Sequence, residues 1–417
     1  MSKAEKVYSL AAARAMALHA QKLTEPIQQN PGNAGEEVIY QTVKDLGCIQ
    51  IDTLHVVERS QYLVLWSRLG SYDKADFDDL LYDPKKRRLF EGWQHAACFV
   101  PLEDFRYQMP RMNSVQQKQI EQSEWLAEPE NQELCRSVYE RIKNEGALRA
   151  RDFEYDGPKR NGWWDWKPAK NALEYLNARG DLMITERVNF QRVYDLRERV
   201  LPDWVEIESP SEEQRDRYWL EQGVRALGIC QPLQAADYSY LRRNFVRGYI
   251  ADMTAEGVFK EVKVQTNNGD PHTFIVHNEA FELLEQAEKG AIKPRKTTFL
   301  SPFDSLFWAR GRDGEFWDFR ALLEAYKPAP TREWGYFNMP VLYHDQLIGR
   351  IDPKMDRKSG KLLIRGFFLE EGSELHEDLL SGLADAFRSF MDFHQADGLV
   401  FERKEDAQLG SKILPRL

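Results

Sequence analysis

Hydrophobic and polar positions follow the same order three times in the first part of the chain: a helical pattern, a helix stop, and two short alternating strands around a turn. The clearest copy covers residues 167–197, where apolar residues at helical spacing end at Gly180 and an alternating pattern turns near Asn189. Residues 243–277 repeat it around the turn sequence TNNGD. The copy at 76–101 is the least regular. Each copy predicts a helix followed by a hairpin.

Further helical patterns precede these copies, at residues 9–23, 132–144 and 211–226. Helices followed by a small hairpin are typical of the winged helix, a helix-turn-helix variant that usually binds nucleic acid. We therefore expect three tandem winged helices, of which at least one is mainly structural. Their predicted boundaries are 1–115, which includes the candidate catalytic strand described below, 116–205, and 206–296.

The pattern changes after about residue 297. Strand-like segments punctuated by Gly and Pro occupy 300–304, 328–337, 341–352 and 361–370, and a helix of about five turns is expected near 375–394. We expect a C-terminal β-rich, barrel-like domain over 297–417, with the sequence MDRKSG at the tip of a hairpin. The predicted fold class is α+β.

Charge is unevenly distributed along a chain whose balance is 57 − 67 = −10. This balance argues against an indiscriminate nucleic-acid coat protein, but a local DNA-binding face needs only clustered cations. Residues 85–88 read KKRR, and residues 349–366 hold six basic residues against two acidic ones. Ordinary solvated surface is the alternative explanation. The candidate DNA-binding residues are Lys85, Lys86, Arg87, Arg88, Lys354, Arg357 and Lys358.

Several common chemistries have no motif in this chain. There is no P-loop, no dinucleotide Gly-x-Gly-x-x-Gly, no Gly-x-Ser-x-Gly elbow and no His-Glu-x-x-His pair. The eight histidines are scattered and the four cysteines lie far apart, so we expect no cofactor, no metal and reduced thiols in a cytosolic protein. No uncharged apolar run approaches the ~18 residues of a membrane helix. Residues 356–358 resemble the tail of a nuclease carboxylate-x-Lys motif, which keeps a metal nuclease as a further alternative.

The segment CIQIDTLHVVERS (48–60) holds the most informative polar residues. It follows a helix that ends at Gly47, and its first residues suit a short strand. Because successive side chains on a strand point to opposite faces, Gln50 and Asp52 are expected on one face and the neighbouring isoleucines in the core. Alternatively, Asp52 or Thr53 caps a helix that starts at Leu54.

The run IQIDTLHVVERSQYLVLWSRLG (49–70) resembles the bacterial DNA glycosylases that unhook interstrand cross-links, the YcaQ/AlkX-like branch of the AlkZ-type winged-helix family. WQHAACFVP (93–101), GWWDWKP (162–168), NFQRVYDL (189–196), LSPFD (300–304) and GYF (335–337) are similar to it in the same order. The resemblance covers roughly residues 10 to 400. It implies three winged helices and a C-terminal β-domain around a concave DNA channel.

The family's catalytic motif is Gln-hydrophobe-Gln or Gln-hydrophobe-Asp, and Gln50, Ile51 and Asp52 match the Asp form. An N7-alkylated guanine is already positively charged, so it departs without a general acid and leaves an oxocarbenium-like sugar. The resemblance implies that Asp52 stabilises this sugar and acts as base toward water, while Gln50 positions the water. No lysine adjoins the motif, so we expect hydrolysis without strand cleavage.

The expected partner is therefore double-stranded DNA with alkylated or cross-linked purines. We expect a monomeric, cytoplasmic, nucleoid-associated enzyme. The rival from another class is a non-catalytic winged-helix regulator, which needs no Gln-x-Asp and usually dimerises on a palindrome. His95 is a candidate substrate contact, although a histidine beside Trp93 and Cys98 also suits a core position. Trp163, Trp164 and Trp166 are candidates for base stacking or for packing between domains.

Overall fold

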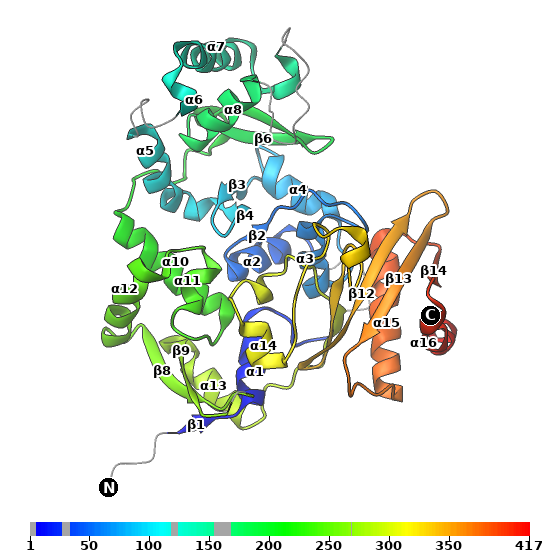
Figure 1. Ribbon diagram of the computed structural model, residues 1–417. Helices are drawn as coiled ribbons and strands as arrows, with labels where there is room; N and C mark the ends of the chain where they lie inside the picture. Colours follow the sequence, from blue (N-terminus) through cyan, green and yellow to red (C-terminus); the bar gives the residue numbers. More distant parts are fainter. Residues whose placement is uncertain (1–5, 27–33, 118–123, 154–167, 268) are drawn as a thin grey trace. The chain divides into compact units, whose positions relative to one another are not determined.

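Figure 1 shows the computed structural model of the chain, which describes residues 6–26, 34–117, 124–153, 168–267 and 269–417. Helices and strands are mixed along the chain, as the predicted α+β class requires. The chain forms two compact units, one of Met1–Lys74, Gln94–Cys98 and Asp216–Leu417 and one of Ala75–Trp93 and Phe99–Arg215. The hairpin of β3 (Leu89–Trp93) and β4 (Ala97–Pro101) contributes residues to both units, because its turn, Gln94–Cys98, belongs to the first and the rest of it to the second.

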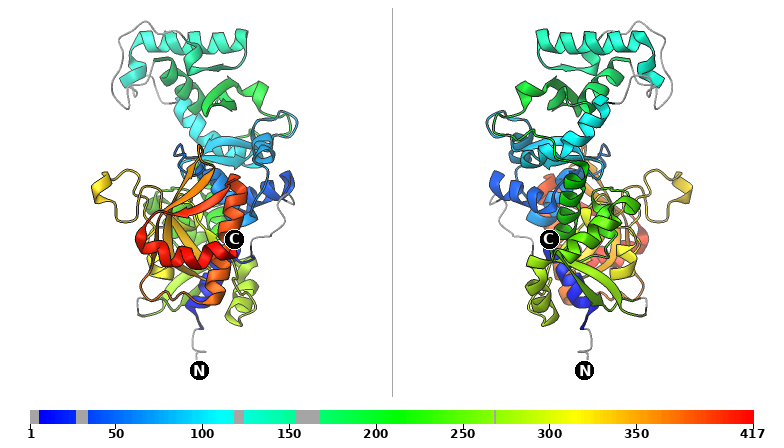
Figure 2. Two further views of the ribbon diagram at one scale, coloured as in Figure 1. Left: turned by 90° about the vertical axis from the view of Figure 1, so that its right-hand side faces the viewer. Right: turned by 90° about the vertical axis from the view of Figure 1, so that its left-hand side faces the viewer.

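The first unit contains a five-stranded, curled half-barrel sheet near the C-terminus (Figures 1 and 2). Its first four strands form an antiparallel meander, and the fifth pairs in parallel with the fourth because α15 (Glu377–His394) connects them. Phe387 and Phe390 of α15 pack on Phe299 of the sheet, with ring centroids 4.7 and 5.5 Å away. The strands are β10 (Thr297–Phe299), β11 (Met339–Tyr343), β12 (Gln346–Asp356), β13 (Lys361–Leu369) and β14 (Gly398–Phe401).

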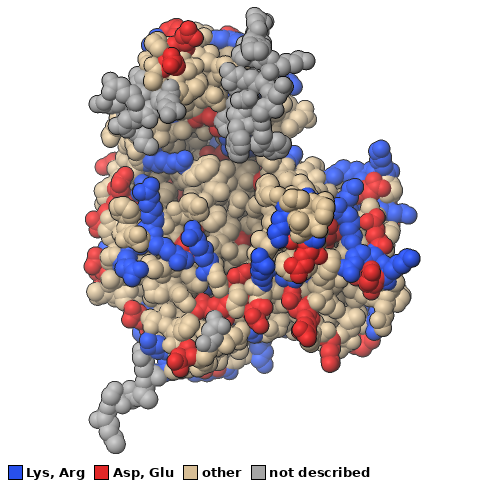
Figure 3. Space-filling view, viewed as in Figure 1, with Lys and Arg blue, Asp and Glu red and all other residues tan. Residues whose placement is uncertain are grey.

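The hairpin of β12 and β13 carries the predicted cationic tip. Asp356 pairs with Lys361, so residues 357–360 form the turn, and Gly360 adopts the left-handed φ of 68° that favours glycine. Figure 3 shows Lys and Arg side chains, with some acidic ones among them, over this hairpin on the right of the view. The predicted strands at 300–304 and 328–337 are wrong. Residues 300–304 follow β10 and contain a turn, and 328–337 contains only a short 3₁₀ turn, Ala329–Thr331, where prolines interrupt the chain.

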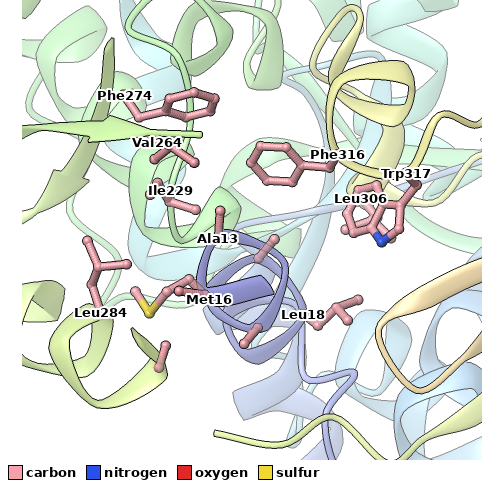
Figure 4. Packing of buried hydrophobic residues seen from close by; sticks show 14 of the residues in the cluster. Ala13, Met16, Leu18, Ile229, Val264, Phe274, Leu284, Leu306, Phe316 and Trp317 are labelled. Carbon is pink, nitrogen blue, oxygen red and sulfur yellow. The ribbon is translucent and has the colours of Figure 1, made fainter. Parts of the chain in front are cut away.

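A helical core lies in the same unit around α1 (Leu10–Ala20). Figure 4 shows Ala13, Met16 and Leu18 of α1 among apolar side chains from much later in the sequence. These come from a three-stranded sheet and its helices and from the segment that follows β10, and include Ile229, Val264, Phe274, Leu284, Leu306, Phe316 and Trp317. In that sheet β1 (Val7–Tyr8) runs parallel to β8 (Phe259–Val264), which pairs antiparallel with β9 (His272–His277). Burial of these side chains joins the N-terminal helix to segments from the second half of the chain.

The second unit is built around the sheet β5-β7-β6. Its hairpin of β6 (Leu182–Val188) and β7 (Gln191–Leu196) turns at Asn189 and Phe190, which have φ values of 51° and 65°. Two left-handed residues in succession are typical of the tight type I′ hairpin turn. The helices α7 (Pro129–Glu145) and α8 (Pro168–Ala178) and the strand β5 (Leu148–Arg149) complete this unit's core.

The predicted helix–hairpin order is confirmed in all three places. The helices before the hairpins are α4 (Lys74–Tyr82), α8 and α12 (Arg243–Ala255), and the hairpins are β3–β4, β6–β7 and β8–β9. The predicted C-terminal helix is α15. That these units act as winged helices, and that the chain divides into four domains, stay predictions.

Candidate active site

The predicted catalytic segment begins at the end of α2 (Glu36–Leu46). Gly47 ends this helix with a φ of 77°, a conformation that favours glycine, and a Cβ atom there would displace the end of the Gln222 side chain, which lies 2.6 Å away. The short strand β2 (Ile49–Gln50) follows, and the Ile51 N–H continues the pairing by donating to the Ala97 carbonyl at 2.8 Å. The predicted strand therefore exists but is short.

The carboxylate of Asp52 lies just past this strand. Because β2 ends at Gln50, the strict alternation that was predicted does not extend to Asp52: Ile51 is half-buried, and Asp52 is only 8% exposed. The alternative in which Asp52 or Thr53 caps a helix starting at Leu54 is wrong, since residues 51–59 contain no helix and α3 spans Ser60–Leu69.

Backbone groups are the main partners of Asp52. Its Oδ1 accepts the Leu54 N–H at 2.6 Å, and its own N–H donates to Gln61 Oε1 at 3.5 Å. Burial raises the pKa of the carboxyl, and the backbone N–H groups and the charge of Arg59 offset this only in part. Among the described residues no lysine or arginine lies within ion-pair distance of Asp52. A buried carboxylate with a raised pKa is suited to act as a base.

The hairpin tip contacts the same segment. The Arg357 guanidinium donates to the Val57 carbonyl at 3.0 Å and to His55 Nε2 at 2.7 Å. Burial lowers the pKa of His55, and its Nε2 also lies 3.1 Å from Glu58 Oε1, whose charge opposes this shift. On the other side, Glu58 pairs with Lys74 at 2.7 Å. His55, Val57 and Glu58 are therefore held by Arg357 and Lys74, which local sequence patterns did not reveal.

The phenol of Tyr326 lies within electrostatic reach of the Asp52 carboxylate. Tyr326 is 76% exposed. Partial desolvation of its phenol, together with the Asp52 charge, still raises the pKa of this group. Its loop is fixed by the fully buried Glu324, which accepts the backbone N–H groups of Glu333 and Trp334 at 2.9 and 2.7 Å. Tyr326 was missed because nothing in its local sequence links it to the Gln-x-Asp motif.

The LSPFD sequence (300–304) supports α3, the helix that follows the predicted catalytic segment. Ser301 and Ser60, the first residue of α3, share a hydrogen bond of 2.6 Å. Asp304 forms a bidentate ion pair with Arg68 of the same helix, with one N–O distance of 2.8 Å and both side chains fully buried. These contacts hold α3 against the C-terminal part of the unit.

His95 lies in a different environment from Gln50 and Asp52. Its ring stacks on Trp308 with centroids 4.2 Å apart, and Nδ1 lies 3.1 Å from the Asp237 carbonyl. It lines a cavity whose wall contains neither Gln50, which is half-buried, nor Asp52. The predicted stacking residues Trp163, Trp164 and Trp166 lie outside the described residues.

The predicted cationic clusters differ in exposure. In KKRR, Arg87 is only 5% exposed and donates to the backbone carbonyls of Leu81 and Val200 at 2.9 and 2.7 Å. Lys86 is exposed and pairs with Asp79, Lys85 is exposed, and Arg88 is half-buried. The hairpin residues Lys354, Arg357 and Lys358 are all exposed.

The described residues contain neither a metal-binding cluster nor a membrane-spanning helix. No group of three or more His, Cys, Asp or Glu side chains in the described ranges is placed to hold a metal ion. No described helix is long and apolar enough to span a membrane.

Comparison with known proteins defines the class. The model of the AlkZ-like DNA glycosylase family matches residues 43–393, so this chain belongs to that family and is a DNA glycosylase, an enzyme of DNA repair. In fold it is similar to the DNA glycosylase AlkZ of Streptomyces sahachiroi, with a TM-score of 0.60 and 14% identity over 95% of this chain and 100% of that one. The family that the sequence resembled is thereby confirmed.

Proposed function

We propose that this glycosylase hydrolyses the N-glycosidic bond of N7-alkylated purines in double-stranded DNA and unhooks interstrand cross-links, as a member of the YcaQ/AlkX-like branch. The observation that carries the proposal is the Asp52 carboxylate, which is buried next to a strand end with backbone partners and a raised pKa. Gln50 and Asp52 fit the Gln-hydrophobe-Asp motif of that branch.

The charge on the base sets the chemistry. As the C1′–N9 bond breaks, the N7-alkylated base takes the bonding electrons and leaves as a neutral molecule, while positive charge develops on the sugar. Asp52 stabilises this charge, and water bonds to C1′ and gives its proton to the carboxylate. Gln50 holds the water in line with C1′. The products are the free base and an abasic site in an uncut strand.

The DNA contacts belong to the same proposal. Lys354 and Lys358 on the hairpin and Lys85 and Lys86 in the KKRR cluster are exposed cations suited to phosphates. We infer that the three helix–hairpin units serve as winged helices, that the enzyme acts as a monomer, and that it works on chromosomal DNA in the cytoplasm. His95 is proposed as a further substrate contact.

The test is a duplex with a single N7-methylguanine, incubated with the wild type and with Asp52→Asn in the presence and absence of EDTA. We expect free N7-methylguanine and an abasic strand with the wild type, equally with EDTA, since the cationic leaving group needs no Lewis acid. Chelation that abolishes excision, restored by Mg²⁺ or Zn²⁺, would replace this scheme with a metal-dependent one. Tight binding to undamaged palindromic DNA without excision would favour the regulator.

A further inference from the structure

A cavity of about 370 Å³ opens at the turn between β3 and β4 in the first unit. Ligand-binding pockets usually measure about 300–1,000 Å³, so this one suits a ligand of nucleotide size. Its lining comes from the β3–β4 turn, from the segment that joins α11 (Gln234–Tyr238) to α12, and from the segment around Trp308. The lining includes His95, Tyr240, Arg242, Phe245, Trp308 and Arg310.

Aromatic rings form one wall and the rim. His95 and Trp308 are stacked within 5° of parallel, and Tyr240 meets His95 edge to face at 5.8 Å. Tyr240 and Phe245 are 67% and 69% exposed, which is unusual for such large rings. Tyr240 also has a left-handed φ of 56°, a conformation that bulky residues rarely adopt. This φ belongs to a Schellman motif at the end of α11, in which the N–H groups of Tyr240 and Leu241 donate to the carbonyls of Asp237 and Ala236 at 3.2 and 2.8 Å. The end of the helix therefore places Tyr240 where its ring is exposed.

The charges of the cavity are arranged for an anion. Its acidic residue, Asp237, is only 5% exposed, and its carboxylate accepts bonds from Arg243 Nε at 2.9 Å and from the Arg310 backbone N–H at 3.0 Å. The Arg310 Nε lies 3.9 Å from the same carboxylate, but the side chain is 72% exposed. Arg242 is exposed and lies over the Phe245 ring at 5.8 Å. Two guanidinium groups therefore face solvent beside two exposed rings.

The His95 ring adds a hydrogen-bond acceptor. Its Nδ1 lies 3.1 and 3.2 Å from the carbonyls of Asp237 and Tyr238, so Nδ1–H donates and Nε2 carries the lone pair. Burial lowers the pKa of His95, which keeps the ring neutral near pH 7. A neutral imidazole next to stacked rings can accept a bond from an exocyclic amino group of a base.

We propose that this cavity binds one unpaired nucleotide of the DNA, with its base stacked on Tyr240 and Phe245 and its phosphate on Arg242 and Arg310. Bases inside a duplex present only their edges, so exposed aromatic faces fit a base outside the stack. Guanidinium groups bind phosphate by charge and by paired donors. The proposal rests on the proposed function only in taking DNA as the partner.

The cavity is also connected to the catalytic segment. His95 lies two residues before Ala97, whose carbonyl accepts the Ile51 N–H of the Gln-x-Asp motif. The same turn thus carries a wall of the cavity and the partner of the motif strand.

The test uses the full chain and undamaged DNA, so that binding is measured without excision. Two duplexes are compared, one with a single bulged 2-aminopurine nucleotide and one fully paired. We expect about tenfold tighter binding of the bulged duplex and quenching of its fluorescence. Tyr240→Ala with Phe245→Ala should remove the preference, because stacking on aromatic residues changes affinity about 5- to 150-fold per base. Tyr240→Phe should keep it.

The arginines are tested by salt dependence. Arg242→Gln with Arg310→Gln should lower the slope of log affinity against log salt by about 1.4 on single-stranded DNA. Arg295→Gln removes an equally exposed arginine outside the cavity, and Trp204→Ala an exposed ring of the other unit, and both should retain the wild-type preference for the bulge. Unchanged melting temperatures confirm folding, since all four substituted cavity residues are exposed.

Two outcomes separate this inference from the proposed function. If the wild type shows no preference for the bulge, or if the aromatic variant keeps it, the cavity does not bind an unpaired nucleotide, whatever the excision assay shows. If the preference is present and depends on Tyr240 and Phe245 but N7-methylguanine is never released, the inference stands and the proposed substrate is wrong.

Discussion

Two buried carboxylates in the same unit have opposite surroundings. Asp304 is fully buried and forms a bidentate ion pair with Arg68, which also donates to Gln21. Asp52 is 8% exposed and has backbone N–H groups as its partners. The region of Asp304 joins α3 to the segment after β10, whereas Asp52 lies in the irregular segment before α3.

The difference supports the function that we propose for each region. A buried charge costs free energy unless charged groups and hydrogen bonds compensate it. Asp304 is compensated by a full charge on Arg68, so this region serves stability. Asp52 is compensated only in part, and its raised pKa records the remaining cost. Natural proteins retain such a cost where a reactive group is needed.

Asp52→Asn should produce the largest change in activity. We expect base excision to fall by a factor of about 10² to 10⁴, the usual contribution of an acid–base group, with DNA affinity nearly unchanged. The free energy of unfolding at pH 7 should stay the same or rise, because Asn carries no charge and its Oδ1 can still accept the Leu54 N–H. Single-turnover release of N7-methylguanine and urea unfolding measure the two effects. Wild-type activity, or a variant that unfolds, would show that Asp52 is structural.

Arg68→Ala should lower the stability of the fold strongly and leave the excision activity nearly unchanged. It leaves the Asp304 carboxylate buried and unpaired, which should lower the free energy of unfolding by about 3–5 kcal/mol. Excision per folded molecule should stay within a few-fold of wild type, because Arg68 is not part of the Gln50 and Asp52 motif. Urea unfolding and an active-site titration separate these quantities. The double variant Arg68→Met with Asp304→Leu serves as the control and should recover much of the stability. Loss of excision in a stably folded double variant would assign this region a catalytic function.

The pH dependence should follow the Asp52 carboxyl. As base, Asp52 acts deprotonated, so excision should fall up to tenfold per pH unit below its pKa, which burial raises above the ordinary value of about 3.9. The stability contribution of Asp52 changes with pH in the opposite direction to that of a carboxylate in an ion pair. The folded state holds an extra proton between the unfolded and folded pKa values, so the contribution of Asp52 to stability falls as pH rises through that window. Single-turnover rates and urea unfolding across this window test both trends, and a rate that stays flat down to the ordinary pKa would contradict the assignment of the base.

Local sequence patterns predicted the Asp52 region but not the Arg68–Asp304 ion pair. The helix that ends at Gly47, the short strand and the buried Asp52 follow from local spacing and from the resemblance to the family. Arg68 and Asp304 are separated by 236 residues, and pairing across such a distance leaves no periodic signal. The LSPFD sequence was recognised, but its contacts with α3 became evident only in three dimensions.

A run of basic residues in the sequence also did not predict which of its side chains are exposed. Four adjacent basic residues predicted one DNA-binding cluster at KKRR. Arg87 is buried there because its guanidinium satisfies backbone carbonyls, including that of Val200, 113 residues away. The sequence cannot distinguish such an arginine from an exposed one, because the carbonyls that it satisfies belong to distant segments. The opposite holds at the hairpin tip, where the turn sequence itself predicted exposure.

The smallest effects should come from the hairpin tip, and they test whether the Asp52 region depends on a distant support. Lys358 is exposed, so Lys358→Ala should weaken binding to damaged and undamaged duplex alike and lower the salt slope by about 0.9, with little change in the bound-state rate. Arg357→Ala should have the same effect on binding if Arg357 contacts a phosphate. It should also slow excision several-fold, because Val57 and His55 lose the guanidinium that holds the catalytic segment.

Neither variant should change the free energy of unfolding by more than about 0.5 kcal/mol, the usual range for surface substitutions, since the Arg68–Asp304 pair is untouched. Salt titrations of affinity and single-turnover rates at saturating enzyme distinguish the two residues. Equal rates in both variants would show that the catalytic segment holds its position without the hairpin. Unchanged affinity and salt slope in both would exclude the tip from the DNA-binding face and leave the exposed lysines of KKRR as the next candidates.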